Sequence, residues 1–539
     1  MIVFENMSVT YPDRERPALE GVELAIGEGE LALVVGPTGA GKSTLLRSVN
    51  GLVPHFSGGR LTGRVLVDGR STADHRPRDL ADVVGFVGQD PDATFVADIV
   101  EDELAYSMEN LGLSPPTMRR RVEDVLDILN LHSLRQRAIM SLSGGQRQRV
   151  AIGAVLTAAP RLLVLDEPTS SLDPISAEEV LAALSRLVHD QGVTIVVAEH
   201  RLERIVHAAD VIVSVPETAG GVRAGPPAAM LALSSVAPPI VRLAQVAGWD
   251  PLPLSVRDAR RLAGGLRQRL VVRPAAVGRP TPGPVVATVR RLSARYGRLL
   301  ALEGVSLDLA AGEVTAVMGR NGAGKTTLLR HLVGLRSPEQ GSVTVQGRKP
   351  SEMRPAEAVR LVGLVPQDPA SMLSADSVVA ECRDADHDAS LAPGRTRATL
   401  ERLMPGLSDQ IHPRDLSEGQ RLALALAIVL APAPPLILLD EPTRGLDYIA
   451  KSRLTVMLRD LAAEGHSVVL ATHDVELVAD TADRVVVLAD GEIITDGPTR
   501  EVVCHTPGLA PQVARILAPT EWLTVAEVES ALVDSGSIR

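Results

Sequence analysis

The chain has few of the residues on which several classes of protein depend. Its 539 residues include two cysteines, two tryptophans, four tyrosines and four phenylalanines. Two cysteines cannot form a disulfide framework or a four-cysteine zinc site, and they favour a reducing compartment. Aromatic residues make up only 2% of the chain, which leaves little material for binding single-stranded nucleic acid by base stacking.

A strongly basic composition is also missing. Lys and Arg number 55 against 66 Asp and Glu, and the net charge of −11 argues against a wide nucleic-acid-coating surface, although it leaves room for a local basic patch. We expect no nucleic-acid partner. The first residues, MIVFENMSVTYPD, lack the charged-then-apolar order of a secretory signal. One long uncharged stretch, Leu422 to Leu439, contains three prolines that would break a membrane-spanning helix. We expect a buried helix, a turn and a short strand there, in a protein that is soluble or peripheral to a membrane.

The chain contains one pattern twice. The segment Ala18–Val22 (ALEGV) returns 283 residues later as Ala301–Val305, and Leu165–Thr169 (LDEPT) returns 274 residues later as Leu439–Thr443. The offset shrinks along the chain, so the two halves are collinear, with short deletions in the second. Such self-similarity predicts a tandem duplication in which each half forms its own core.

Each half alternates short apolar strands with helical stretches. Residues 161–165 and 193–198 are short apolar runs, typical of strands buried on both faces of a parallel sheet. Between Pro91 and Leu142 the pattern becomes helical, which predicts a helical insertion. The predicted fold class is α/β.

A glycine-rich loop follows an apolar strand and precedes a helix in each half. Its glycines allow backbone N–H groups to surround phosphate oxygens at a helix N-terminus, and the serine or threonine after the lysine ligates Mg²⁺. Only four lysines occur in the chain, and two of them stand in these loops. The predicted nucleotide-binding residues of the loops are Gly36, Pro37, Thr38, Gly39, Ala40, Gly41, Lys42, Ser43 and Thr44, and Gly319, Arg320, Asn321, Gly322, Ala323, Gly324, Lys325, Thr326 and Thr327.

An acidic pair ends an apolar strand in each half. Asp166 and Asp440 can hold Mg²⁺ directly or through water. Glu167 and Glu441 are placed to orient an attacking water and to take its proton. The same pairs also suit a structural turn before a proline, and the pairs taken alone do not decide between the two interpretations.

The segment Leu142–Gln146 (LSGGQ) matches the signature of the ATP-binding cassette (ABC) family, which the sequence therefore resembles. The second copy, Leu416–Gln420 (LSEGQ), departs from that signature at Glu418. The resemblance implies two tandem P-loop NTPase cassettes and a signature that meets the γ-phosphate held by the opposite cassette. We read Glu418 as a sign of slower or asymmetric turnover. The implied nucleotide-binding residues here are Ser143, Gly144, Gly145 and Gln146, and Ser417, Gly419 and Gln420.

Other motifs of the family occur in order in both halves. Gln89 and Gln367 match the Q-loop, which senses Mg²⁺ and touches a membrane partner. Residues 171–173 and 445–447 match the D-loop. The remaining matches are the switch histidines, His200 and His473, and the adenine-stacking aromatics, Tyr11 and Tyr296, for which simple packing is the alternative. The implied Mg²⁺ ligands are Ser43, Gln89 and Asp166 in one half and Thr326, Gln367 and Asp440 in the other.

The resemblance sets the predicted domain limits. We predict ABC ATPase cassettes at residues 1–232 and 286–505, a helical tail at 233–270, a Pro/Gly linker at 271–285 and a C-terminal tail at 506–539. Each cassette has a mixed or parallel sheet core, and the chain forms a pseudo-dimer with two composite ATP sites. The first combines the first P-loop, Asp166, Glu167 and His200 with Ser417 and Gly419. The second combines Lys325, Asp440, Glu441 and His473 with Ser143 and Gly145.

The segment after the first Q-loop, Gln89–Ala105 and then Glu109–Leu113, is similar to the energy-coupling-factor (ECF) ATPases of prokaryotic vitamin and metal-ion importers. The tails around Trp249 and Trp522 also resemble that family. This likeness implies a transmembrane T component and a small substrate-binding S component as partners, at the cytoplasmic face of the cell membrane. ATP and Mg²⁺ are the expected substrate and cofactor.

Two alternatives remain. One is the ATPase of a peptide importer with fused cassettes, whose tails and Q-loop segment differ from those here. The other is a ribosome-associated ATPase of the ABC-F type, which carries a long charged helical hairpin between its cassettes. Here the interval instead holds an Arg-containing tail and the Pro/Gly segment Val271–Pro284. The transported substrate is not encoded in this chain, because specificity would lie in another polypeptide.

Overall fold

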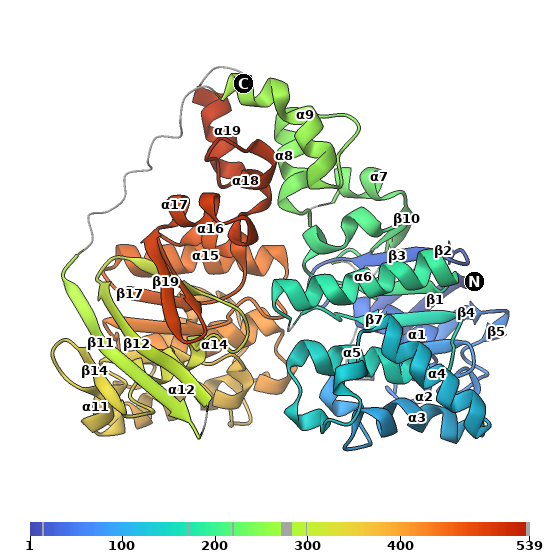
Figure 1. Ribbon diagram of the computed structural model, residues 1–539, viewed down its shortest axis with the longest axis horizontal. Helices are drawn as coiled ribbons and strands as arrows, with labels where there is room; N and C mark the ends of the chain where they lie inside the picture. Colours follow the sequence, from blue (N-terminus) through green and yellow to red (C-terminus); the bar gives the residue numbers. More distant parts are fainter. Residues whose placement is uncertain are drawn as a thin grey trace. The chain divides into compact units, whose positions relative to one another are not determined.

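The computed structural model (Figure 1) describes residues 1–12, 16–170, 172–217, 220–234, 236–270, 283–297 and 299–534. The chain divides into two compact units, residues 1–255 and 256–539. Residues 271–282, most of the predicted linker, lie outside the described residues, as does Ser171 of the first D-loop.

The first unit contains two sheets. An antiparallel sheet has the order β2-β1-β4-β5, and a six-stranded sheet has the order β10-β9-β3-β8-β7-β6, parallel except for the pair β9 and β10. The strands are β1 (Ile2–Thr10), β2 (Leu19–Ile26), β3 (Leu31–Val35), β4 (Arg60–Val67), β5 (Arg70–Ser71), β6 (Val84–Val87), β7 (Leu162–Asp166), β8 (Thr194–Ala198), β9 (Val211–Ser214) and β10 (Arg223–Gly225). The helices are α1 (Lys42–Val49), α2 (Leu52–His55), α3 (Val100–Asn110), α4 (Pro115–Ile128), α5 (Gly144–Leu156), α6 (Pro174–Gln191), α7 (Pro227–Ala232) and α8 (Pro239–Ala247).

The second unit repeats this plan. Its antiparallel sheet has the order β12-β11-β14, and its six-stranded sheet has the order β15-β16-β17-β13-β18-β19, with β18 and β19 antiparallel. The strands are β11 (Val285–Tyr296), β12 (Leu299–Ala310), β13 (Val314–Met318), β14 (Gln340–Val345), β15 (Val362–Val365), β16 (Leu436–Asp440), β17 (Ser467–Ala471), β18 (Arg484–Ala489) and β19 (Glu492–Pro498). The helices are α9 (Val256–Arg269), α10 (Lys325–Leu332), α11 (Pro355–Ala358), α12 (Val378–Asp388), α13 (Arg395–Leu403), α14 (Glu418–Leu430), α15 (Tyr448–Ala463), α16 (Val475–Thr481), α17 (Thr499–His505), α18 (Gln512–Leu517) and α19 (Val525–Asp534).

The central strands explain the parallel arrangement. Every residue of β3, β7 and β8 is buried, as is every residue of β13, β16 and β17. Strands buried on both faces need helices on each side, and the crossover connections supply them. The α/β prediction, with a helical insertion at α3 and α4, is confirmed.

The uncharged stretch at 422–439 is also as expected. It consists of most of α14, a turn and most of β16. In the part of the chain that the structure describes, no helix is both long enough and apolar enough to span a bilayer.

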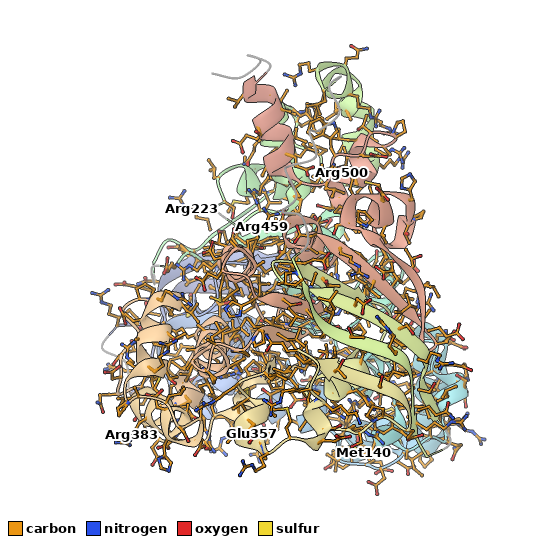
Figure 2. The ribbon with its side chains drawn as sticks, turned by 90° about the vertical axis from the view of Figure 1, so that its left-hand side faces the viewer. Met140, Arg223, Glu357, Arg383, Arg459 and Arg500 are labelled. Carbon is orange, nitrogen blue, oxygen red and sulfur yellow. The ribbon has the colours of Figure 1, made fainter. Side chains whose placement is uncertain are left out.

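Helix α9 departs from the predicted domain limits. The prediction assigns residues 233–270 to the tail of the first half, but α9 groups with the second unit. The side chains of Ala259, Ala263 and Leu266 are buried, and the Arg267 guanidinium donates to the Ile516 carbonyl of α18 at 2.7 Å. In the same unit Arg500, labelled in Figure 2, pairs with Glu527 of α19 at 2.5 Å. The remaining limits stay predictions.

Candidate functional site

The two glycine-rich loops connect β3 to α1, which are both labelled in Figure 1, and β13 to α10. The residue before each helix, Gly41 or Gly324, has a φ of 106° or 104°, a conformation that side chains with a Cβ rarely adopt. The loop lysines reach back across the loops. Lys42 Nζ donates to the Gly36 carbonyl at 2.9 Å, and Lys325 Nζ donates to the Gly319 carbonyl at 2.8 Å. Each loop therefore places an ammonium group at the start of a helix, where a phosphate binds.

Two of the three predicted Mg²⁺ ligands are adjacent in each unit. Asp166, at the end of β7, lies beside Ser43, and Asp440, at the end of β16, lies beside Thr326. Burial raises the pKa of Asp166, and a hydrogen bond from Ser43 opposes that rise. Burial likewise raises the pKa of Asp440, and Thr326 opposes it. The Oδ1 atom of Asp440 is buried and has no hydrogen-bond partner among the residues described here.

A divalent cation fits these oxygen atoms. Mg²⁺ prefers oxygen ligands and usually keeps waters and substrate phosphates in its shell. Among the described residues, no group of three or more His, Cys, Asp or Glu side chains is arranged to hold a metal. At each site one carboxylate and one hydroxyl, Asp166 with Ser43 or Asp440 with Thr326, offer oxygen ligands to an ion held together with a nucleotide. Gln89 and Gln367, the other predicted ligands, are exposed just after β6 and β15.

The predicted general base of the first unit is held from two sides. His200 Nε2 lies 2.7 Å from Glu167 Oε1, and Gln89 Nε2 donates to Glu167 Oε2 at 3.1 Å. Glu167 follows β7 directly and is buried, with a φ of 53°. A positive φ in a non-glycine residue costs about 1–3 kcal/mol and is typical of functional sites. The strained backbone places the carboxylate within reach of both the His200 imidazole and the Gln89 amide.

The second unit builds the corresponding cluster differently. His473 Nδ1 lies 2.8 Å from Glu441 Oε2, and the other oxygen, Oε1, lies 3.5 Å from Lys325 Nζ. Glu441 also has a positive φ, 50°. In both units the catalytic candidates predicted from sequence are brought together, but the hydrogen bond from a Q-loop glutamine to the glutamate is described for the first unit only.

The signature residues start helices α5 and α14. Ser143 caps α5, accepting a hydrogen bond from Gln146 N at 3.3 Å, while the Gln146 side chain accepts from Ser143 N at 3.0 Å. Ser417 and Gln420 form the same reciprocal pair on α14, at 3.3 and 2.9 Å. This capping box fixes the first turn and leaves backbone N–H groups of the turn directed outward for an anion.

The two predicted adenine-stacking tyrosines have unlike surroundings. Tyr11 packs against the hydrophobic core of the first unit, and its hydroxyl lies 3.2 Å from Thr44 Oγ1. The ring of Tyr296 lies under the Arg336 guanidinium, 4.1 Å from the ring centre. Tyr296 is the more exposed ring, and Arg336 covers one of its faces. Packing alone can therefore explain the presence of an aromatic ring at Tyr11 better than at Tyr296.

Sequence reasoning missed several supporting charges. Glu199, fully buried beside His200, accepts a hydrogen bond from Thr169 N at 2.8 Å. Lys451 pairs with Asp474, next to His473, at 2.7 Å, and both side chains are buried. The rarity of lysine was a usable signal for Lys451. Only four lysines occur in the chain, and Lys451, like the two P-loop lysines, lies in the first turn of a helix. Nothing in the local pattern marks Glu199.

Comparisons with known proteins agree with this geometry. The ABC transporter family model matches residues 19–170 and 302–444. A Streptomyces avermitilis protein named "Putative ABC transporter ATP-binding protein" is 57% identical, covering 99% of this chain and 100% of its own length. A Methanosarcina mazei protein of the same name is 35% identical, covering 93% and 90%.

Among solved structures, the archaeal ribosome recycling factor aABCE1, in complex with the ribosomal stalk protein aP1, is 21% identical. The alignment covers 90% of this chain and 88% of that one, with a TM-score of 0.57, a likeness of fold. The paired cassettes, the family match over both halves and the full-length relatives lead to one conclusion: this chain belongs to the ABC transporter family, as an ATP-binding protein with two cassettes and the ATPase activity of that family.

Proposed function

We propose that this protein is the ATP-hydrolysing subunit of an energy-coupling-factor importer for a micronutrient, either a vitamin or a transition-metal ion. Two features support the importer type. The segment Gln89–Ala105 resembles the ATPases of such importers, and a groove suited to a partner lies along that segment. The groove is the observation that carries the proposal of a docked membrane protein.

The groove lies between β6, α3 and α5 of the first unit and has a volume of about 160 Å³. Apolar side chains line much of it, among them Phe86, Val87 and Tyr106, and Tyr106 is 41% exposed. Beside it Val96 is 62% exposed. A shallow apolar groove of this kind accepts the apolar face of a short helix. A cytoplasmic helix of a transmembrane subunit has that chemistry.

A buried carboxylate holds one wall of the groove in place. Glu103, on α3, accepts hydrogen bonds from Val96 N at 2.9 Å and from Ala97 N at 2.7 Å. The segment that follows Gln89 is thereby tied to the helix that carries Tyr106. A partner that pushes on the groove can therefore shift Gln89, which bonds to Glu167.

The chemistry proposed for each site follows from the cluster around the P-loop. Lys42 or Lys325 neutralises charge on the β- and γ-phosphates. Ser43 with Asp166, or Thr326 with Asp440, would hold Mg²⁺, which withdraws electron density from the γ-phosphate. Glu167 or Glu441 takes the proton of the attacking water at a carboxylate oxygen. The adjacent histidine orients that carboxylate.

In this proposal each site is completed by the signature of the other half. Ser417 and Gly419 would meet the γ-phosphate bound at the first P-loop, and Ser143 and Gly145 would meet the one bound at the second. Each charge-assisted hydrogen bond made only with ATP present contributes about 1.5–3 kcal/mol. Closure of the two halves on ATP would then drive the T component, and through it a substrate-loaded S component, from the cytoplasmic face of the membrane.

The test is to purify the tagged full-length protein from its native membranes in mild detergent and to identify what accompanies it. We expect one multi-span T component together with a small S protein. Recovery of ribosomes, or of two permease chains with a peptide-binding protein, contradicts the importer type and leaves the ATPase assignment intact.

A groove variant supplies the matched control. In Tyr106→Asp a charge replaces the exposed ring at a position that is 41% exposed. We expect this variant to hydrolyse ATP like the wild type in the absence of partners and to lose the T component during purification. Retention of the T component by Tyr106→Asp would show that docking occurs elsewhere.

A further inference from the structure

The two signature helices differ at their first residue. Helix α5 begins with Gly144 and α14 with Glu418. A carboxylate on the first turn interacts favourably with the helix dipole but repels an anion that binds to the same N–H groups. Glu418 is therefore expected to weaken phosphate binding at α14 unless its charge is neutralised.

Arg421 neutralises it. Its Nη1 atom lies 2.6 Å from Glu418 Oε1, one turn along the helix. Its Nη2 atom donates to the Leu416 carbonyl at 2.9 Å and to the Arg414 carbonyl at 3.3 Å. The arginine side chain is only 16% exposed, so the guanidinium is fixed beside the signature rather than solvated.

The first cassette uses the corresponding arginine differently. Arg147 directly follows the first signature, as Arg421 directly follows the second. The Nε atom of Arg147 lies 3.1 Å from Asp92 Oδ1. Asp92 belongs to the turn of 3₁₀ helix η2 (Pro91–Ala93) that follows the Q-loop glutamine. The residue in the same place of η8 (Pro369–Met372) is Ala370, which carries no charge.

The acidic partner of this arginine thus comes from a different segment in each half. In the first cassette it comes from the Q-loop turn, and in the second it comes from the signature itself. Helix α14 keeps its arginine neutralised although the Q-loop acid is absent. In return the arginine holds the unusual carboxylate along the side of the helix.

The D-loop confines Glu418 further. A Cβ atom placed on Gly445 would come within 3.0 Å of the Glu418 Cγ, so the two residues are in near contact. Gly445 itself has a φ of 68°. The stem of Glu418 projects from the first turn of α14 beside the D-loop, and its carboxylate is directed to Arg421.

We propose that Arg421 is a positioning residue that holds the Glu418 carboxylate away from ATP bound at the first P-loop. The inference rests on the proposed function, in which the N-terminus of α14 meets that γ-phosphate. Arg421 then makes a signature with an acidic third residue competent, and the first site depends on an ion pair that the second site does not need.

The experiment is a double-mutant cycle on the full chain, measuring the KM for ATP in steady-state hydrolysis. A Glu441→Gln background limits turnover to the first site. We expect Arg421→Gln to raise the KM about tenfold, equivalent to about 1.4 kcal/mol, because the carboxylate is released towards the phosphate. Adding Glu418→Gly to Arg421→Gln should return the KM to within about twofold of the parent.

The matched control is Arg147→Gln, whose partner is Asp92. We expect Glu418→Gly to leave the KM of Arg147→Gln unchanged. A second variant, Glu418→Gln, tests the idea without altering Arg421 and is expected to change the KM less than about twofold, because the charge it removes is already neutralised.

Two results would overturn the inference. One is an Arg421→Gln defect that Glu418→Gly does not repair, which means that the arginine acts through the Leu416 and Arg414 carbonyls alone. The other is a large fall in KM in Glu418→Gln, which means that the carboxylate faces the phosphate despite Arg421. Failure of the composite site on which the inference rests looks different: in the Glu441→Gln background, Ser417→Ala would then leave the KM for ATP unchanged.

Discussion

The two cassettes hold their switch histidines with opposite arrangements of charge. In the first unit His200 lies between Glu199 and Arg201, and the Glu199 carboxylate accepts from Thr169 N. In the second unit His473 lies between Thr472 and Asp474, and Asp474 pairs with Lys451 of α15. Both solutions tie the histidine loop to the segment around the D-loop. The two units share the position of the histidine but not of the acidic residue beside it. That residue precedes the histidine in the first unit and follows it in the second.

The surfaces near the two Q-loops also differ. The buried glutamate is common to both, since Glu381 accepts from Ser374 N at 2.9 Å and Ala375 N at 2.8 Å, as Glu103 does in the first unit. The surface beside it is not. Tyr106 of α3 corresponds to Asp384 of α12, which follows the exposed Arg383 labelled in Figure 2. The surface beside the glutamate is thus apolar at Tyr106 in the first unit and charged at Asp384 in the second.

The largest effect expected is on hydrolysis, and it tests whether the two sites are equivalent. Glu167→Gln and Glu441→Gln should each lower ATP turnover, and the double variant should lose about 10²–10⁴-fold and accumulate a closed form with ATP bound. Steady-state phosphate release and trapping of labelled nucleotide measure both. Equal losses in the single variants would show that the differences between the clusters do not matter for the rate. Unchanged turnover in the double variant would refute the assignment of the bases.

The next effect concerns the buried ion pair of the second unit. Lys451→Met leaves the Asp474 carboxylate buried without its cation, and breaking a buried pair in this way costs about 3–5 kcal/mol of unfolding free energy. Urea denaturation followed by circular dichroism measures it. The double change Lys451→Met with Asp474→Asn should recover most of the loss. If the single change is harmless, the pair is not what holds His473.

A pH-dependent effect is expected in the first unit. Burial, reinforced by the charge of Glu167, raises the pKa of Glu199 to about 7 from its ordinary value of 4.5. The folded state therefore binds a proton more tightly than the unfolded state. The stability that this group contributes is present below pH 4.5 and is lost as the pH rises through about 7.

Glu199→Gln keeps an oxygen acceptor for Thr169 N and carries no charge. It should match the wild type at pH 5 and exceed it at pH 8, by an amount on the order of 2–3 kcal/mol. Thermal unfolding measured from pH 5 to pH 8 checks this. Thr472→Val, at the matching position of the second unit, should shift stability by the same amount at every pH. A constant difference between Glu199→Gln and the wild type would contradict the prediction.

The smallest effect concerns the buried glutamate that both units share. Glu103→Ala and Glu381→Ala each remove an acceptor for two backbone N–H groups, at a cost of about 1–3 kcal/mol. Because the geometry is the same, the two losses should agree within about 0.5 kcal/mol. Glutamine at either position retains an acceptor oxygen and should cost less. Unequal losses from the alanine variants would show that the two segments are supported differently.

The sequence was sufficient for the fold, and it singled out the glutamates and histidines that the structure brings together beside each P-loop helix. A P-loop, an acidic strand end and a signature helix each have local patterns, because backbone geometry and phosphate chemistry limit the residues allowed there. The supporting pairs have no such pattern. Asp92 and Arg147, or Lys451 and Asp474, are far apart along the chain and come together only when separate helices and turns pack. The roles of Tyr11 and Tyr296 looked alike in sequence because the difference lies in Arg336, whose counterpart Val53 is buried.

The membership of α9 in the second unit has a consequence for dissecting the protein. The chain passes from one unit to the other at Ser255–Val256, some 30 residues before the repeat becomes recognisable again at Val285. A gene fragment for the second cassette that starts at residue 286 would omit the helix whose Arg267 binds the Ile516 carbonyl, and would expose the face of α18 to water. A fragment that starts at Val256 keeps that contact. To separate the two units as two polypeptides, the chain should therefore be cut between Ser255 and Val256, inside the tail that the sequence predicts for the first half.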